Sequence, residues 1–465
     1  MVLKEFPWKL LQTKAAFVAV IVGAILNRSW SGEAPARIDS NPRLVRKVDF
    51  GEYGSRHIRF GDLDGDGLPE IVLVQANPST AYITCLTAID LEGRILWQVG
   101  SPDVRNSYYK GENLQIYDLD HDGHNEVIYN SDEKTAITIL DGKTGTIKKR
   151  VQLAGKYSKY DTILFVDFSG RGYPQEVFLA DAFSNGFSIF DQNFKQLWSK
   201  QDSHIGHYPI NYDFDGDGKD ELLCGYALYD HNGRELWNHR EFPEHNDATY
   251  IGDMDGDGHA EIAMATSVDA VLLDEAGSIL FRKTMNHCQH ALIGKFRQDL
   301  PGKQVVFVSR EQKKERAEFG FAKLSMFTKS GQLLWSKETE ENLWVAAALV
   351  VDSWTGNSNE NFVAMEERGF SPPALLDGEG HEIATFPFPP AILERGEGRF
   401  VSAQERSGPG GRKLYDEYHL DHLDCYGDER EEILVYNQKA LYIYTNAALW
   451  QKARLYNHNY FPGRR

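Results

Sequence analysis

Short apolar runs and polar turns alternate along nearly the whole chain. Apolar and polar residues alternate with period two in segments such as 70–75 and 440–445. This period is typical of half-buried β-strands, and no long stretch has the spacing of an amphipathic helix. The pattern therefore predicts an all-β protein.

A nine-residue acidic pattern, Asp-x-Asp-x-Asp-Gly-x-x-Glu, occurs four times, each time before an apolar run. Ca²⁺ prefers about 6–8 oxygen ligands, which alternating carboxylates on a tight glycine turn can supply. An EF-hand would place its Glu three residues later, between helices, so strand-to-strand calcium loops are predicted. The expected ligands of up to four structural Ca²⁺ ions are Asp62, Asp64, Asp66, Glu70, Asp118, Asp120, Asp122, Glu126, Asp213, Asp215, Asp217, Glu221, Asp253, Asp255, Asp257 and Glu261.

Degenerate copies of this loop start at Asp167, Lys295, Asp352 (with Glu360) and Asp424. A hairpin repeat, Asp-x-x-Gly-x-x-Leu-Trp, lies between many of the loops. Periods of about 40–50 residues in an all-β pattern are typical of propeller blades. Residues 37–465 are therefore predicted to form a single eight-bladed β-propeller with four-stranded antiparallel blades. A seven-bladed ring is the alternative.

Two finer predictions follow from the repeat. Segment 43–50 has strand alternation but precedes the first inner strand. It is expected to complete the last blade as a clasp, since ring closure removes open sheet edges. The loop at Lys295 is expected to bind no ion, because a cation replaces its first carboxylate.

Residues 1–36 are predicted to be a signal peptide or an N-terminal anchor. Lysines precede the apolar run 15–26, which is shorter than the ~20 residues that span a bilayer. A signal peptide implies a secreted, periplasmic or cell-surface protein with no membrane span after processing. The four cysteines lie in different units and are predicted to be buried thiols. The formal net charge of −18, without a basic stripe, argues against nucleic-acid binding.

A second candidate site lies where the predicted inner strands begin, at the channel mouth opposite the calcium loops. Histidine, tyrosine and arginine gather there, and these side chains suit proton transfer and carboxylate recognition. A structural role for any single histidine is the alternative, and free carboxylates such as Asp247 are expected to be solvated or strand-end residues. The mouth residues are Arg56, His57, Asn113, Lys159, Tyr160, His207, Tyr208, His245, Asn246, His290, Arg310, Arg368, Tyr418 and His419.

The acidic repeats resemble the FG-GAP class of calcium-loop propellers, which includes adhesion modules and polysaccharide-degrading enzymes. Segments 204–213, 424–432 and 454–457 resemble blades of rhamnogalacturonan lyases and related ulvan lyases. The resemblance implies a secreted, monomeric lyase that cleaves an acidic polysaccharide of rhamnose and uronic acid by β-elimination. Two alternatives remain open: a propeller that binds carbohydrate or protein without turnover, and a glycosidase that releases rhamnose from uronic acid.

The same resemblance implies roles for the mouth residues. His207 would remove the C5 proton of the uronic acid, and Tyr208, Tyr160 or His290 would protonate the leaving oxygen or complete the pair. Arg310 or Arg368 would neutralise the carboxylate. The remaining mouth residues would bind substrate.

Overall fold

The structure is a computed structural model, and the chain divides into two units, residues 1–39 and 40–465. The residues it describes are 42–446, apart from 56, 79, 81, 107–112, 132–134, 154–161, 182–185, 203–204, 207, 244, 313–318, 340–345, 356–359, 368–371, 388–417 and 429. The predicted signal peptide lies outside this range. Among the described residues, no helix is long and apolar enough to cross a membrane.

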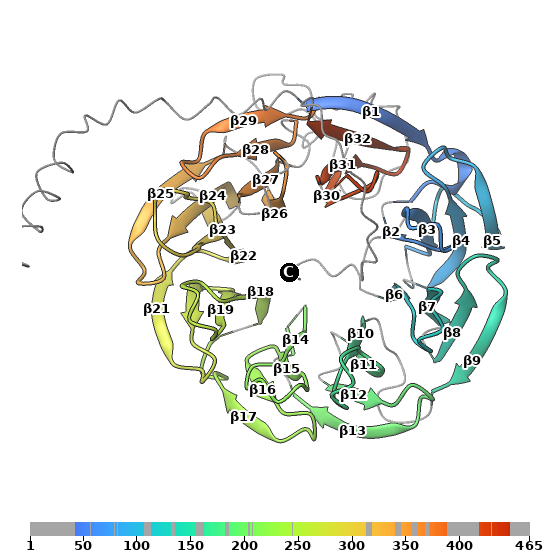
Figure 1. Cartoon of the computed structure of the whole chain (residues 1–465), viewed down its shortest axis with the longest axis horizontal. Helices are drawn as coiled ribbons and strands as arrows, with labels where there is room; N and C mark the ends of the chain where they lie inside the picture. Colours follow the sequence, from blue (N-terminus) through green and yellow to red (C-terminus); the bar gives the residue numbers. More distant parts are fainter. Residues whose placement is uncertain are drawn as a thin grey trace, which may run out of the picture. The chain divides into compact units, whose positions relative to one another are not determined.

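The second unit consists of eight four-stranded antiparallel sheets arranged as the blades of a ring (Figure 1). Blades 1 to 4 contain, from the inner strand outward, β2 (Ile58–Gly61), β3 (Glu70–Ala76), β4 (Ile83–Ile89), β5 (Ile95–Gly100); β6 (Leu114–Tyr117), β7 (Glu126–Ser131), β8 (Ala136–Asp141), β9 (Ile147–Gln152); β10 (Thr162–Val166), β11 (Glu176–Asp181), β12 (Gly186–Phe190), β13 (Gln196–Gln201); β14 (Ile210–Tyr212), β15 (Glu221–Cys224), β16 (Ala227–Tyr229), β17 (Glu235–Asn238). Blades 5 to 8 contain β18 (Asn246–Gly252), β19 (Glu261–Thr266), β20 (Asp269–Leu273), β21 (Ile279–Thr284); β22 (Cys288–Gly294), β23 (Gln304–Gln312), β24 (Phe319–Phe327), β25 (Leu333–Glu338); β26 (Ala346–Asp352), β27 (Asn361–Glu367), β28 (Ala374–Leu376), β29 (Glu382–Thr385); β30 (His419–Leu423), β31 (Glu432–Tyr436), β32 (Ala440–Asn446) and β1 (Pro42–Asp49).

Blade 8 joins the two ends of the described chain. β1 pairs with β32 in antiparallel register from Pro42↔Asn446 to Asp49↔Ala440. The Phe50 amide extends the ladder by donating to the Lys439 carbonyl at 2.8 Å. The predicted clasp and the eight-bladed ring are confirmed, and the seven-bladed alternative is wrong.

The hairpin repeat ends in a tryptophan because that side chain connects neighbouring blades. Its indole N–H donates to a hairpin carbonyl of the next blade in four cases: Trp97 to Gly142 at 2.6 Å, Trp198 to His231 at 3.2 Å, Trp237 to Glu275 at 3.0 Å and Trp335 to Gly378 at 3.0 Å. The ring also covers a glycine of that hairpin. Gly277, for example, has φ +82°, and a Cβ there would lie 2.8 Å from the Trp237 ring. The glycine and tryptophan of the repeat are therefore two halves of one contact.

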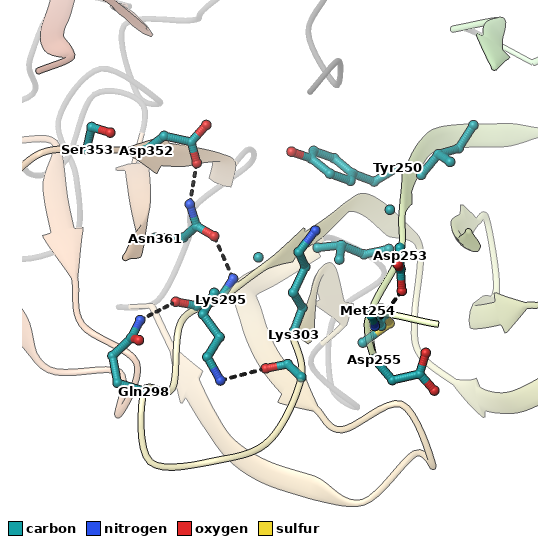
Figure 2. Close-up of a pocket in the computed structure, with 16 residues that line it drawn as sticks. Tyr250, Asp253, Met254, Asp255, Lys295, Gln298, Lys303, Asp352, Ser353 and Asn361 are labelled. Atoms are coloured by element: carbon teal, nitrogen blue, oxygen red, sulfur yellow. Dashed lines mark hydrogen bonds between the residues drawn. The ribbon is translucent and has the colours of Figure 1, made fainter. Parts of the chain in front are cut away.

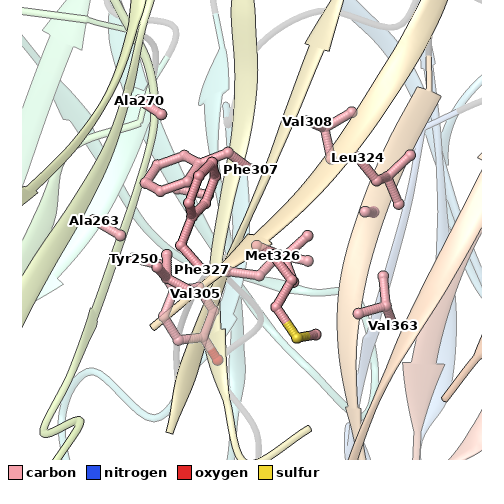
Figure 3. Close-up of a cluster of buried hydrophobic side chains, with 14 of the residues drawn as sticks. Tyr250, Ala263, Ala270, Val305, Phe307, Val308, Leu324, Met326, Phe327 and Val363 are labelled. Carbon is pink, nitrogen blue, oxygen red and sulfur yellow. The ribbon is translucent and has the colours of Figure 1, made fainter. Parts of the chain in front are cut away.

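Apolar side chains fill the spaces between blades. Figure 3 shows Phe307 and Phe327 of blade 6 packed beside Tyr250 and Ala263 of blade 5, and all four are less than one-tenth exposed. The large aromatic area removed from water makes such contacts a principal source of stability. The four cysteines are buried and free, as predicted.

Candidate functional site

Each acidic loop connects an inner strand to the next strand outward, and its glutamate is the first residue of that second strand. Glu70, Glu126, Glu221 and Glu261 are 2–5% exposed. One carboxylate oxygen of each accepts the amide of the second loop residue, at 2.6, 2.9, 2.9 and 2.8 Å respectively. These bonds leave the other oxygen to face the loop interior.

The aspartates are fixed by the loop backbone. The two oxygens of Asp62 accept the amides of Gly65 at 2.7 Å and Gly67 at 2.9 Å, and both glycines have positive φ. As a result, three ligand oxygens lie within 4.8 Å of one another in each of four clusters. These are Asp62–Asp64–Asp66, Asp118–Asp120–Asp122, Asp213–Asp215–Glu221 and Asp253–Asp255–Glu261.

The donor set fits a hard cation, because carboxylate oxygens converge on one point in each loop. In blade 4, Oδ1 of Asp213 is buried, and within the described part of the chain it has no hydrogen-bond partner. Burial, helped by the neighbouring aspartates, raises the pKa of Glu70 and of Glu221 to about 7. Because the carboxylates of each loop lie so close together, a bound cation would be favoured, and the four clusters could hold metal ions.

Three of the four degenerate loops are closed by their own side chains. In blade 3 the Ser169 hydroxyl donates to Glu176, and in blade 7 the Thr355 hydroxyl donates to Glu360 at 2.9 Å. In blade 6 the Lys295 ammonium donates to the Leu300 carbonyl and, at 2.9 Å, to that of Gly302. In blades 3 and 6, the hydroxyl of Ser169 and the lysine Lys295 thus occupy positions that carry carboxylates in the intact loops.

One assignment from the sequence is wrong. In the intact loops, the residue before the first Asp pairs with the loop glutamate, as Gly61 does with Glu70. In blade 7 the residue before Asp352 is Val351, and it pairs with Phe362. Glu360 therefore lies two residues before the glutamate register.

The loops also connect adjacent blades. The polar residue before the glutamate register bonds to the preceding loop: Asn125 to the Asp62 carbonyl at 2.7 Å, Asp220 to the Asp167 amide at 2.8 Å, Asn361 to the Lys295 amide at 2.5 Å and Glu431 to the Asp352 amide at 2.7 Å. Glu431 also pairs with Nδ1 of His422 at 2.8 Å. The bonds to the preceding loops link the loops of blades 1 and 2, 3 and 4, 6 and 7, and 7 and 8.

A pocket of about 650 Å³ opens on this face, where β18, β22 and β26 end. Figure 2 shows the side chain of Lys303 extending into the pocket on the side of Tyr250, with Asp352 and Asn361 across from it. The lining mixes cations, carboxylates and amides, so it suits a hydroxylated or charged ligand. The sequence did not predict this pocket; its only signal was a pair of lysines in the loop that lost its carboxylates.

The channel mouth was predicted to carry the chemistry, and the structure describes it in part. Arg56, Lys159, Tyr160, His207 and Arg368 lie outside the described residues. The described members divide by exposure. Five are buried between blades: His57, Asn113, Asn246, Tyr418 and His419.

The buried members make structural contacts. The Asn246 amide group donates to the Gly225 carbonyl at 2.9 Å and to the Thr249 hydroxyl at 2.7 Å. Burial lowers the pKa of His57 well below its ordinary value, and the nearby Arg59 and His419 lower it further. His57 is therefore neutral at physiological pH. The substrate-binding role of these residues stays a prediction.

The remaining mouth residues retain exposure, and they come from three consecutive blades. Tyr208 of blade 4 is 37% exposed. His245 of blade 5, and His290 and Arg310 of blade 6, are partly exposed. The Arg310 amide donates to the His287 carbonyl at 3.1 Å. A proton carrier, a phenol and a guanidinium thus occur on adjacent blades.

Sequence reasoning missed one member of this group. Asp247 was expected to be a solvated or strand-end residue; it lies at the start of β18 but is 7% exposed, and its Oδ1 lies 3.4 Å from Nε2 of His245. Its other oxygen accepts the Ser267 hydroxyl at 3.3 Å. A carboxylate that is itself held in place can orient a histidine for proton transfer. Strand alternation gave no signal for this pair, because His245 precedes β18 and Asp247 lies at an irregularity of the β18–β19 pairing between Asn246 and Ala248.

Fold and site together define an eight-bladed β-propeller with acidic loops on one face and a His/Tyr/Arg mouth on the other. No family model matches the chain, so the FG-GAP resemblance stays a prediction. Two relatives from Bacillus subtilis are similar in sequence. Rhamnogalacturonan exolyase YesX is 25% identical over 266 residues, and rhamnogalacturonan endolyase YesW is 23% identical over 269.

Each match covers 44% of this chain, and the chain spans less than half of either relative, 43% and 42% respectively. Among solved structures, a rhamnogalacturonan lyase from Bacillus licheniformis superposes with a TM-score of 0.56 at 16% identity, over 85% of this chain and 72% of that one. The V. cholerae biofilm matrix protein Bap1 gives 0.55 at 14% identity, over 88% and 89%. At such identities the structural likeness shows the fold alone. The sequence homologues are lyases of one polysaccharide class.

Proposed function

We propose that the protein is a polysaccharide lyase that cleaves a polysaccharide of rhamnose and uronic acid by β-elimination. The observation that carries the proposal is the pairing of His245 with the buried Asp247 at a mouth that also contains Tyr208, His290 and Arg310. The names of the sequence relatives support the same substrate class.

The proposed reaction breaks the C5–H and C4–O bonds of the uronic acid and forms a C4=C5 double bond. A histidine removes the C5 proton, either His207, as the sequence resemblance implies, or His245 oriented by Asp247. Tyr208 or His290 protonates the leaving oxygen. A guanidinium such as Arg310 binds the carboxylate in a bidentate manner and stabilises the negative charge that develops on it.

The acidic loops belong to the scaffold in this proposal. They would hold up to four Ca²⁺ ions, each of which neutralises a turn whose carboxylates otherwise repel one another. A signal peptide in residues 1–36 would export the protein to a calcium-rich compartment, where it acts as a secreted or cell-surface monomer.

The test is release of unsaturated uronide, measured by ultraviolet absorbance, from a panel of uronic-acid polysaccharides that includes rhamnogalacturonan and ulvan. A lyase produces the absorbance. Release of rhamnose without absorbance would identify a glycosidase instead. Saturable binding to a polysaccharide without any product would identify a binding propeller. Either result would reject the lyase.

A further inference from the structure

In blade 2 a lysine lies inside the acidic loop. The Lys148 ammonium is 2.9 Å from Asp120, 3.3 Å from Asp122 and 2.5 Å from Glu126. These three carboxylates belong to three separate positions of the loop pattern. The ammonium therefore occupies the point on which the proposed calcium ligands converge.

Blade 5 repeats the arrangement with a lysine from elsewhere in the chain. Lys329 comes from the β24–β25 hairpin of blade 6, and its ammonium lies 2.6 Å from Asp255 and 2.7 Å from Glu261. The two lysines reach equivalent loops from different elements, Lys148 from strand β9 of the same blade and Lys329 from a hairpin of the next blade. In both loops the buried glutamate and at least one aspartate share a single point charge.

The other two intact loops differ. Among the described residues, no lysine or arginine forms an ion pair with the carboxylates of the loop at Asp62 or of the loop at Asp213. At the first loop, Lys143 donates to the Asp64 backbone carbonyl at 3.3 Å rather than to a carboxylate. In the second, Lys219 bonds instead to His231 at 3.3 Å.

We propose that Lys148 and Lys329 are internal counter-ions that divide the four loops into two classes. The loops of blades 1 and 4 take calcium directly, whereas those of blades 2 and 5 take it only after the ammonium is displaced. An ammonium supplies three donors and no acceptor, so it cannot join a calcium ion as a ligand and must leave. Calcium binding there loses charge-assisted hydrogen bonds that already stabilise the loop.

This inference rests on the calcium sites proposed above, and titration calorimetry with Ca²⁺ on protein stripped with EDTA tests both. Wild type is expected to show two tight and two weaker sites. Lys148→Met and Lys329→Met keep the side-chain length and remove the charge, so each should tighten one weak site by about tenfold or more. The matched controls are Lys149→Met, whose ammonium lies over the Phe194 ring, and Lys337→Met, whose ammonium pairs with Glu382.

Thermal melts give a second readout. Without calcium, Lys148→Met should melt below wild type, because its carboxylates lose their counter-charge; in saturating calcium the difference should vanish or reverse. Unchanged affinities, or equal loss of Tm with and without calcium, would make Lys148 a purely structural residue and overturn the inference. Failure of the loops at Asp62 and Asp213 to bind calcium would reject the calcium sites themselves, and the inference with them.

Discussion

The two faces of the ring differ in how regularly their sequence pattern repeats from blade to blade. On the loop face, one motif recurs in blade after blade, and three of its four degenerate copies are closed by a hydroxyl or a lysine, such as Ser169 or Lys295. At the mouth, the equivalent positions carry no single recurring residue but vary among histidine, asparagine and tyrosine. Some of them, such as His57, are buried, and others, such as Tyr208, are exposed. Repetition therefore indicates what the ring needs to hold together, and its loss at the mouth indicates where chemistry can be introduced.

The largest expected effect belongs to the mouth. His207→Ala should lose about 10²–10⁴-fold in turnover while remaining folded, because general acid–base catalysis is worth that much. Uronide release and a melting curve measure the two quantities. His124→Ala, on the exposed loop face, is the matched control and should keep full activity. If the His207→Ala enzyme is folded and has normal turnover, the role of general base would be assigned to His290 or to His245 instead.

The next effect belongs to the loop face. Removal of calcium should lower Tm by on the order of 10 °C, because each ion contributes about 3–4 kcal/mol when free calcium is about 100–1,000 times its Kd. A melting curve after verified EDTA treatment measures this change. Readdition of Ca²⁺ should restore Tm. An unchanged Tm in metal-free protein would mean that the loops are stable without ions.

Blade 8 tests the loop face with an incomplete loop. This loop keeps the glutamate of the acidic pattern but lacks the carboxylate at the second Asp position. Burial raises the pKa of Glu432 to about 8 from an ordinary value near 4.5. Its protonated form is thus favoured by folding, and stability should fall as pH rises from about 4.5 through 8, by at most ~1.4 kcal/mol per pH unit.

Glu432→Gln should remove this dependence. Melting curves in calcium-saturated buffer should show the variant matching wild type near pH 5 and exceeding it by a few degrees at pH 9. A variant that melts below wild type at both pH values would show that the ionised carboxylate stabilises the blade instead.

The smallest effect concerns the outer rim, which both faces share. Trp237→Phe removes the indole bond to the Glu275 carbonyl and keeps a ring over Gly277. The expected loss is about 1 kcal/mol, or roughly 2 °C in Tm. Blade 5 already carries Phe281 over Gly331 at this position, so the phenyl ring fits. A loss of several kcal/mol would mean that the indole bond contributes far more than a typical hydrogen bond.

The sequence predicted the fold because the motifs that build it are local. A loop pattern and a hairpin pattern, repeated at blade spacing, determine the blade count, and strand alternation in 43–50 predicts the clasp. The shift of Glu360 out of register was not predictable, because spacing alone cannot show which residue pairs with Val351.

The sequence predicted which residue types gather at the site, but not which of them are exposed or which residues contact one another. Whether a side chain at the mouth faces the channel or the next blade depends on packing between blades. His57 is buried, whereas Tyr208 is exposed. Lys329 lies 74 residues from Asp255, so no loop pattern could include it. The burial of Asp247 was not predicted for a similar reason: it comes from neighbours that are distant in the chain, such as Ser267.

The β1–β32 pairing has a consequence for how the ring folds. Seven blades consist of strands adjacent in sequence and can form from hairpins as the chain is made, but β1 must wait for β32. The conformational entropy that the chain loses when these two distant segments come together is lost in that single step. Closure should therefore be the late event of folding, and until it occurs the incomplete eighth blade has an unpaired edge open to other chains.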